Sequence, residues 1–191
     1  MINAIETRYA GCRFRSRLEA RWAVFFDTLG IRWEYEPQGF VIDGQTYLPD
    51  FLLPQCGTWV EVKGHAEDLD HKLLEAAARV LPALKPHYES GPRLLVLGPI
   101  PEPREGADWG WLGLEPVEVY EGYTEVFGNW WGFGNWHKNL RPWQLCNTST
   151  ATAYDAGDPD WLTPALDQYE DGVPAAYTAA RSARFEHGET P

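Results

Sequence analysis

The sequence has few cysteines: Cys12, Cys56 and Cys146 are the only three, and they lie far apart along the chain. An odd number of widely spaced cysteines argues against a disulfide framework and favours reduced thiols, which are typical of the cytoplasm. No two cysteines are separated by two residues, so the sequence lacks the ligand spacing of a common structural zinc site. We therefore expect neither disulfides nor structural zinc to hold the fold together.

Long apolar runs are also missing, so we expect no segment to cross a bilayer as a helix. The first residues, MINAIETRYAG, lack the basic segment and the apolar run of a signal peptide. These two absences lead us to expect a cytoplasmic protein without a membrane partner. With 191 residues, of which 44% are hydrophobic and 23% charged, the chain is expected to form one globular domain with extensions.

Positive charge is scarce: 16 Lys and Arg stand against 28 Asp and Glu, which gives a formal net charge of −12. Such a charge argues against a nucleic-acid partner. Most of the acidity lies in residues 100–191, which carry 15 acidic and 5 basic side chains, whereas residues 1–99 carry 13 and 11. The N-terminal half also contains a local basic cluster, formed by Arg8, Arg13, Arg15, Arg17 and Arg21. This half is therefore compatible with nucleic acid.

Two segments of the N-terminal half have the pattern of amphipathic helices. In residues 16–29, Ser16 and Glu19 have the spacing of a capping box. The apolar face of this helix is expected to contain Leu18, Trp22, Phe25, Phe26 and Leu29. A second helix is expected from residue 66 to about residue 81, because Pro82 breaks the pattern. Its inward-facing residues are expected to be Leu69, Leu73, Ala77 and Val80.

The segments around these helices favour β-strands. We expect a short strand in residues 31–37, a hairpin with an Asp43-Gly44 turn in residues 39–51, a strand in residues 58–64 and a buried strand in residues 93–98. In the third of these segments, Val60 and Val62 should point to one face, and Trp59, Glu61 and Lys63 to the other. This order of elements predicts an α/β domain in which a sheet is flanked by helices.

The composition changes after Gly98, where Pro, Gly and acidic residues become frequent. We expect a first domain in residues 1–122 and an aromatic, acidic extension in residues 123–191 that is partly loop or linker. A short strand is expected in residues 117–123, and a Phe-Gly-Asn-Trp motif occurs twice nearby, at 127–130 and 133–136. The extension could pack onto the first domain, stack on bases or bind a protein partner.

The segment YLPDFLLPQCGTWVEVKG, residues 47–64, combines charged residues in a pattern that suits phosphodiester cleavage. This reaction requires hard oxygen ligands for a metal ion, an activated water and positive charge near the phosphate. Asp50 and Glu61 would provide two carboxylates on neighbouring strands. Lys63 lies two residues after Glu61 and therefore points to the same face. The alternative is an ordinary solvent-exposed strand face, on which opposite charges pair across neighbouring strands.

Pro49-Asp50 and Glu61-Val62-Lys63, preceded by a helix that carries Glu19, resemble the motifs of the PD-(D/E)xK nuclease superfamily. The resemblance covers about residues 9–98. It implies a restriction-endonuclease-like core, in which a mixed sheet of about four strands is flanked by helices. It further implies hydrolysis of phosphodiester bonds with Mg²⁺ or Mn²⁺, and we expect a DNA endonuclease rather than an enzyme that acts on RNA. Many members dimerise, so a homodimer is an open alternative.

The same resemblance implies a role for each residue of the pattern. Asp50, Glu61 and the backbone carbonyl of Val62 would bind the metal ion. Lys63 would act as a base or stabilise charge, and Glu19 would supply a further acidic group. Phosphate contacts are expected from Arg13, Arg15, Arg17 and Lys72. Each of these four side chains could instead be an ordinary solvated surface residue, and Glu19 could simply cap its own helix.

Two other interpretations of the whole chain stay open. The chain could be a catalytically inactive module with a nuclease fold that binds nucleic acid or a protein partner through its C-terminal extension. Alternatively, the acidic extension could regulate a nuclease by mimicking DNA and covering its basic face. His65 lies next to Lys63, and we expect it to be an exposed residue at the start of the second helix.

Overall fold

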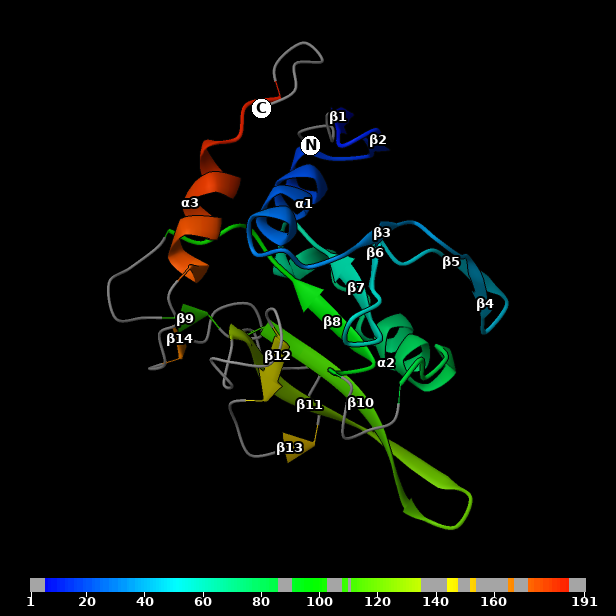
Figure 1. The fold of residues 1–191 in the computed structure, drawn as a ribbon. Helices are drawn as coiled ribbons and strands as arrows, with labels where there is room; N and C mark the ends of the chain where they lie inside the picture. Colours follow the sequence, from blue (N-terminus) through cyan, green and yellow to red (C-terminus); the bar gives the residue numbers. More distant parts are fainter. Residues whose placement is uncertain are drawn as a thin grey trace.

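A mixed β-sheet of eight strands organises the computed structural model (Figure 1). The structure describes residues 6–85, 91–102, 108–109, 111–134, 144–147, 152–153, 165–166 and 172–185. The strand order is β12-β11-β10-β8-β7-β6-β3, with β13 also paired to β11. The bounds are β3 (Glu34–Tyr35), β6 (Phe51–Leu53), β7 (Thr58–Val62), β8 (Leu94–Leu97), β10 (Trp111–Tyr120), β11 (Tyr123–Gly134), β12 (Gln144–Asn147) and β13 (Thr152–Ala153).

The sheet confirms the α/β class, but its size differs from the expected four strands. The pairing of β7 with β8 is parallel, and every other pairing in the sheet is antiparallel. The additional strands come from residues 111–153, in which the sequence predicted only a short strand at 117–123. The boundary expected at residue 122 falls in the turn between β10 and β11. Since both strands belong to the one sheet, this boundary does not separate two sheets.

Three α-helices cover the two faces of the sheet within the described part of the chain (Figure 1). Helices α1 (Arg17–Thr28) and α3 (Val173–Ser182) lie side by side on one face, and α2 (His71–Val80) covers the other. The remaining elements are β1 (Thr7–Tyr9), β2 (Cys12–Phe14), β4 (Phe40–Ile42), β5 (Gln45–Tyr47), β9 (Asp108–Trp109), β14 (Ala165–Leu166) and the 3₁₀ turn η1 (Ala66–Asp68).

Helix α1 begins and ends as its sequence predicts. Ser16 is the N-cap, and its hydroxyl accepts a hydrogen bond from the backbone N–H of Glu19 at 3.2 Å. Gly30, with a φ of +68°, ends the helix, and the Ile31 N–H returns to the Phe26 carbonyl at 2.8 Å. The apolar face that begins at Trp22 is buried in the core, as expected. These two ends fix the position of Glu19 in the first turn.

Helix α2 is shorter than expected, because it begins at His71 rather than at residue 66. Asp70 caps it by accepting a hydrogen bond from the Leu73 N–H at 3.1 Å, and residues 66–68 form the separate turn η1. This start changes which residues face inward. Of the residues expected to face inward, Leu69 and Ala77 are buried, Leu73 is half-buried and Val80 is 53% exposed. The other buried positions in this segment are Leu74, Ala78 and Leu81.

The hairpin predicted around Asp43-Gly44 is present as β4 and β5. Both turn residues have positive φ, +48° and +80°, which is the conformation of a type I′ turn. The hairpin nevertheless forms its own two-stranded sheet and does not extend the central one. Asp50 consequently does not end the hairpin strand: β5 stops at Tyr47, and Asp50 directly precedes β6. Pro49 separates the two strands because it has no N–H to donate.

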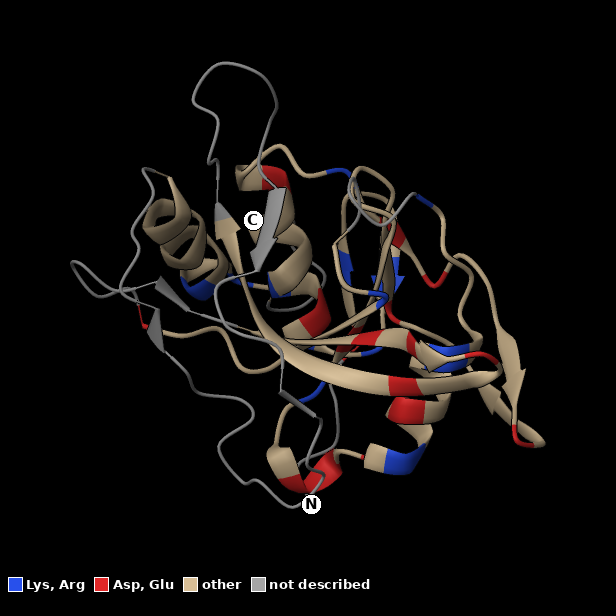
Figure 2. Cartoon of the chain, turned by 90° about the horizontal axis from the view of Figure 1, so that it is seen from below, with Lys and Arg blue, Asp and Glu red and all other residues tan. Residues whose placement is uncertain are grey.

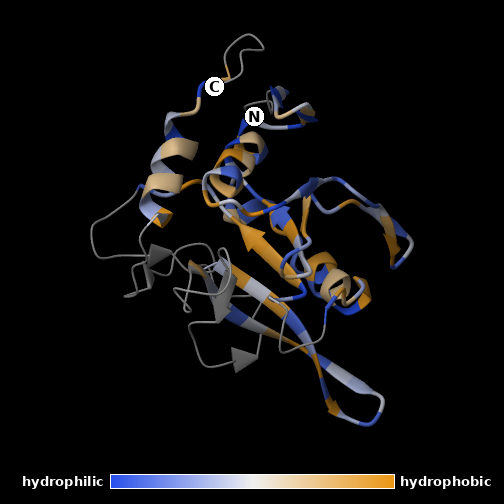
Figure 3. Cartoon of the chain, viewed as in Figure 1, coloured by the Kyte–Doolittle hydropathy of each residue, from blue (hydrophilic) through white to orange (hydrophobic). Residues whose placement is uncertain are grey.

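Two apolar cores lie on the two faces of the sheet. Val60 and Val62 join the core beneath α1, whereas Trp59 joins the core beneath α2, so the predicted alternation along β7 is confirmed. All four residues of β8 are fully buried, in agreement with its uniformly hydrophobic colouring in Figure 3. Two parallel strands that are buried on both faces therefore form the centre of the molecule.

The C-terminal extension contributes to the core beneath α1. Phe133 and Tyr177 are each at most 2% exposed and belong to the same core as Trp22, Phe25 and Trp111 of the first domain. This packing supports the expectation that aromatic residues fasten the extension to the first domain. The end of the second Phe-Gly-Asn-Trp motif and most of the expected linker, residues 147–173, lie outside the described residues.

Candidate functional site

The pairing of β6 with β7 brings the first two predicted site residues together. Phe51 lies opposite Val60, so the next position along the ladder places Asp50 opposite Glu61. Directly opposed residues of antiparallel strands point to the same face of a sheet. Asp50 and Glu61 are only 5% and 6% exposed. The structure thus supports a buried pair of neighbouring carboxylates and not the solvated strand face that was the alternative.

The backbone of Val62 takes part in the same arrangement. Its N–H donates to Asp50 Oδ2 at 2.7 Å, because β6 no longer pairs with β7 at this position. The next N–H, that of Lys63, points the opposite way and donates to the Leu97 carbonyl at 2.9 Å. Since the N–H and C=O of one strand residue point to the same side, the Val62 carbonyl faces the side of Asp50. This direction agrees with the expected role of the carbonyl.

Both carboxylate oxygens of Glu61 have partners. Lys63 Nζ lies 2.7 Å from Oε1, and the Tyr47 hydroxyl donates to Oε2 at 2.8 Å. Lys63 is about one third exposed, so its ammonium group connects the buried glutamate to solvent. The predicted placement of Glu61 and Lys63 on one face of β7 is confirmed by this contact.

Arg15 links the segment before α1 to the carboxylates. Its Nη2 lies 3.1 Å from Asp50 Oδ1, and its Nε forms an ion pair with Glu36. Glu36 has a φ of +45°, which is uncommon for a residue other than glycine, and its N–H donates to the Asp50 carbonyl at 2.9 Å. Arg15 is thereby the one predicted phosphate-binding residue that contacts the carboxylate pair among the side chains described.

Glu19 is held in a separate arrangement close by. Its Oε1 accepts from the Ser16 hydroxyl at 2.6 Å, and its Oε2 accepts from the Tyr35 hydroxyl at 2.7 Å and from the Arg15 N–H at 3.1 Å. The side chain therefore folds back towards the N-cap of its own helix, where it bonds to the Ser16 hydroxyl and the Arg15 N–H in place of the N-cap N–H of a standard capping box. Its charge still reaches the site, because it contributes to raising the pKa of Asp50.

The electrostatics of the site centre on Asp50. Burial raises the pKa of this carboxyl to about 8, and the neighbouring charge of Glu61 acts in the same direction. The Val62 N–H and Arg15 oppose the rise but do not cancel it. Burial lowers the pKa of Lys63, but the charge of Glu61, the hydrogen bond to Glu61 and the charge of Asp50 together leave that pKa above its ordinary value. Burial and Glu61 also raise the pKa of Tyr47, which therefore stays a hydrogen-bond donor.

The carboxylate oxygens at this site are chemically suited to bind a divalent cation. The charge of Glu61 raises the pKa of Asp50 even with Arg15 beside it, so this buried carboxylate would gain from a further cation, and hard oxygen ligands are those that Mg²⁺ and Mn²⁺ prefer. A cation here would replace Arg15 on Asp50 or Lys63 on Glu61. Within the described residues, no group of three or more His, Cys, Asp or Glu side chains is arranged to hold a metal ion. Glu19, turned towards Ser16 and Tyr35, is thus not a third ligand in this conformation.

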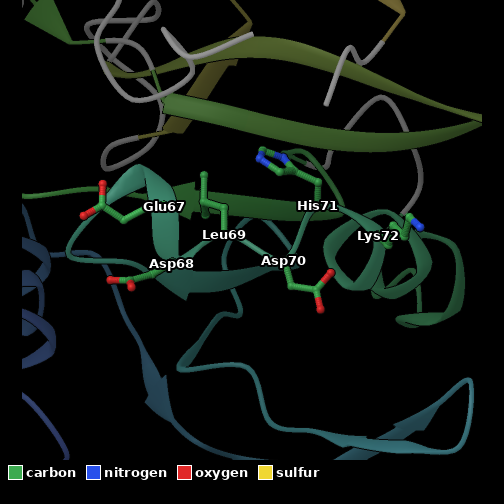
Figure 4. A pocket seen from close by; sticks show the side chains of 6 residues that line it. All are labelled: Glu67, Asp68, Leu69, Asp70, His71 and Lys72. Atoms are coloured by element: carbon green, nitrogen blue, oxygen red, sulfur yellow. The ribbon is translucent and has the colours of Figure 1, made fainter. Parts of the chain in front are cut away.

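The other predicted residues lie apart from the carboxylate pair. Arg13 forms an ion pair with Glu6, and Arg17 lies in the first turn of α1. Lys72 lies at the start of α2 and lines an open hollow whose other residues are Glu67, Asp68, Leu69, Asp70 and His71 (Figure 4). His65, the N-cap of η1, is exposed, as predicted. Three of the residues that line the hollow carry carboxylates and only Lys72 is a Lys or Arg, so this hollow is a poor phosphate site.

Three contacting residues were not predicted from the sequence: Tyr47, Tyr35 and Glu36. Each contacts a charged side chain of the site, but each comes from a segment separated from it by at least ten residues in sequence. Tyr47 lies in the predicted hairpin, and the sequence pattern gave no sign of its partner. Only the position of the β4–β5 hairpin relative to β7 reveals that contact.

Comparison of the chain with family models, with curated proteins and with solved structures found no match in any of the three. Among the described residues, no helix is both long and apolar enough to cross a membrane. The resemblance to PD-(D/E)xK nucleases thus rests on the residues of the motif alone.

Proposed function

We propose that this protein is a metal-dependent nuclease that hydrolyses phosphodiester bonds, and that it cuts DNA internally. The observation that supports this proposal most is the convergence of two buried carboxylates, Asp50 and Glu61, with the Lys63 ammonium group at 2.7 Å from one of them. A buried carboxyl with a raised pKa, here Asp50, next to a second buried carboxylate and a partly exposed cation is typical of a functional site.

Asp50, Glu61 and the Val62 carbonyl would hold Mg²⁺ or Mn²⁺. When bound, the ion would supply Lewis-acid stabilisation of the charge on the phosphate. Lys63 would orient the attacking water or stabilise the negative charge that develops during cleavage. Glu19 would assist through its charge and not as a ligand, since its oxygens already accept three hydrogen bonds.

Arg15 would hold the substrate next to this centre. Its side chain is more than half exposed while it contacts Asp50, so a phosphate group could replace the carboxylate as its partner. Arg13 and Arg17, from the same basic cluster, would contact the backbone further along. The acidic β10–β11 ribbon, marked by red segments in Figure 2, would face away from the DNA, since residues 111–134 hold four Glu and neither Lys nor Arg.

A cleavage assay tests the proposal. Purified protein is incubated with plasmid, linear DNA and RNA in Mg²⁺ or Mn²⁺, beside the variants Asp50→Ala, Lys63→Ala and Arg79→Ala. Loss of Lys63 should slow cleavage about 10²- to 10⁴-fold, the usual range for one proton-transfer or charge-stabilising group. Arg79→Ala, which breaks only the surface pair with Glu75 on α2, should cleave like the wild type. Wild-type protein that cuts none of these substrates, or Asp50→Ala and Lys63→Ala proteins that cut at full rate, would overturn the proposal.

One observation favours a second function, that of a binding module without catalysis. Arg15 and Lys63 already neutralise Asp50 and Glu61, so internal ion pairs could replace the metal ion permanently. Calorimetric titration of Mn²⁺ into the protein, with and without DNA, separates the two functions. Absence of Mn²⁺ binding in both titrations, together with measurable binding of DNA or a protein, would support the module.

A further inference from the structure

Tyr47 is a buried polar residue for which the proposed reaction has no role yet. It is the last residue of β5, it is 5% exposed, and its hydroxyl donates to Glu61 Oε2 at 2.8 Å. Its ring packs in the core beneath α2, together with Ile42, Leu52 and Trp59. The hydroxyl is therefore held in place by a rigid, well-packed ring and by the end of a hairpin strand.

The contact fixes the orientation of the Glu61 carboxylate. A glutamate has a broad, soft rotation about its terminal torsion, so its two oxygens can exchange places unless each has a partner. Tyr47 occupies Oε2 from the hairpin side, and this leaves Oε1 for Lys63. A neutral donor such as a phenol can stay in place when a cation binds, whereas Lys63 and Arg15 carry charges that a metal ion would repel.

We propose that Tyr47 is a positioning residue that presents one chosen oxygen of Glu61 to the metal ion. This inference rests on the proposed function, because it assigns Tyr47 a role at that same site. Groups that hydrogen-bond to a metal-binding side chain orient it, and their loss typically weakens metal affinity about 10- to 100-fold. This role would explain why the β4–β5 hairpin packs against the sheet without joining it.

A purely structural hydrogen bond is the competing explanation. In that case Tyr47 would only satisfy a buried carboxylate oxygen, and its loss would lower stability without any specific effect on metal binding. The two explanations differ in the metal dependence of the reaction. A positioning role predicts a higher Mn²⁺ requirement with kcat nearly restored at saturating Mn²⁺, whereas a structural role predicts an unchanged Mn²⁺ requirement.

The test is Tyr47→Phe, which removes only the hydroxyl. Mn²⁺ affinity is measured by calorimetry, and the Mn²⁺ dependence of cleavage by the assay described above, in both cases beside Glu61→Gln. The expected result is a 10- to 100-fold rise in both the Mn²⁺ dissociation constant and the Mn²⁺ concentration for half-maximal cleavage. Tyr9→Phe is the matched control, because Tyr9 donates a similar hydrogen bond, 2.7 Å long, to Asp27 in α1.

The outcomes distinguish the inference from the function on which it rests. Wild-type protein that neither binds Mn²⁺ nor cleaves overturns the proposed function, and the role of Tyr47 falls with it. Wild-type protein that binds and cleaves, with Tyr47→Phe indistinguishable from it or matched by Tyr9→Phe, overturns the role of Tyr47 alone. If Tyr47→Phe is poorly folded, the same titrations are repeated in sucrose, which favours the compact state. An unchanged Mn²⁺ affinity there also overturns the inference.

Discussion

Asp50 is the residue on which most interactions of the candidate site converge. It accepts a hydrogen bond from the backbone of β7, it contacts Arg15, and it lies opposite Glu61 in the strand register. A carboxylate with so little exposure loses most of its hydration, and the charge of Glu61 adds to that cost. Arg15 offsets only part of this cost, so the site is electrostatically strained unless a proton or a further cation joins it.

This strain predicts a pH-dependent stability. The folded protein holds the proton of Asp50 up to a pKa of about 8, whereas the ordinary pKa of aspartate is 3.8. Between these values the folded state binds more protons than the unfolded state, so the free energy of unfolding should fall as the pH rises from about 4 to about 8. Asp50→Asn, which cannot ionise, should show a shallower fall and be more stable than the wild type at pH 8.

Urea unfolding in EDTA, measured from pH 5 to pH 8.5, checks this expectation. A tenfold change in proton affinity corresponds to about 1.4 kcal/mol, so the change in the free energy of unfolding across this pH range should differ between the two proteins by at least that amount. Asp43→Asn, at the exposed hairpin turn, is the control and should follow the wild type. Parallel pH profiles for Asp50→Asn and the wild type would contradict the assignment of the pKa rise to Asp50.

At the scale of one element, helix α1 combines a structural and a functional demand at its first turn. Glu19 accepts hydrogen bonds from the Ser16 hydroxyl and the Arg15 N–H, and its charge also acts on Asp50. A glutamine can hydrogen-bond to the same groups without carrying a charge. Glu19→Gln should therefore cost about 1 kcal/mol and lower the cleavage rate, whereas Ser16→Ala should cost about 1 kcal/mol and change the rate little. Thermal unfolding and initial cleavage rates of the two variants provide the comparison.

The outcome for these two variants distinguishes the roles of the residue. Equal losses of stability in Glu19→Gln and Ser16→Ala, with unchanged cleavage in both, would show that Glu19 is only a cap. A lower rate in Glu19→Gln alone, at a loss of stability similar to that of Ser16→Ala, would show that its charge serves the reaction.

Short sequence patterns predicted the elements whose formation depends on residues close together along the chain. Ser16 with Glu19 predicted the start of α1, Asp43-Gly44 predicted a tight turn, and the alternation from Trp59 to Lys63 predicted the faces of β7. Each of these features depends on residues within a few positions of one another. The shared face of Glu61 and Lys63 was predictable for the same reason.

Features that depend on distant packing were not predictable. Gly113 weakens the pattern of β10, yet a side chain there would overlap Trp131 and come within 2.7 Å of Pro92, so only the folded sheet explains the glycine. The contact of Tyr47 with Glu61 joins a separate hairpin to the central sheet. Neither relation leaves a periodic signal in the sequence.

At the scale of the whole molecule, the C-terminal helix is part of the core and not an appendage. Tyr177 of α3 is 2% exposed, its ring centroid lies 4.6 Å from that of Phe25 in α1, and its hydroxyl accepts a hydrogen bond from Trp111 of β10 at 3.0 Å. A regulatory role of the acidic extension therefore cannot be tested by deleting residues 147–191. That deletion would also remove α3 and expose the core beneath α1.

Two substitutions in α3 test this conclusion. Tyr177→Ala should lower the free energy of unfolding by about 3–5 kcal/mol, the usual cost of a large aromatic side chain removed from a core. Thr178→Ala, the exposed neighbour whose hydroxyl bonds only within its own helix, should stay within about 0.5 kcal/mol of the wild type. Urea unfolding of both variants gives these values. A cost below about 1 kcal/mol for Tyr177→Ala would mean that α3 detaches from α1 in solution, and the deletion would then be a valid test of regulation.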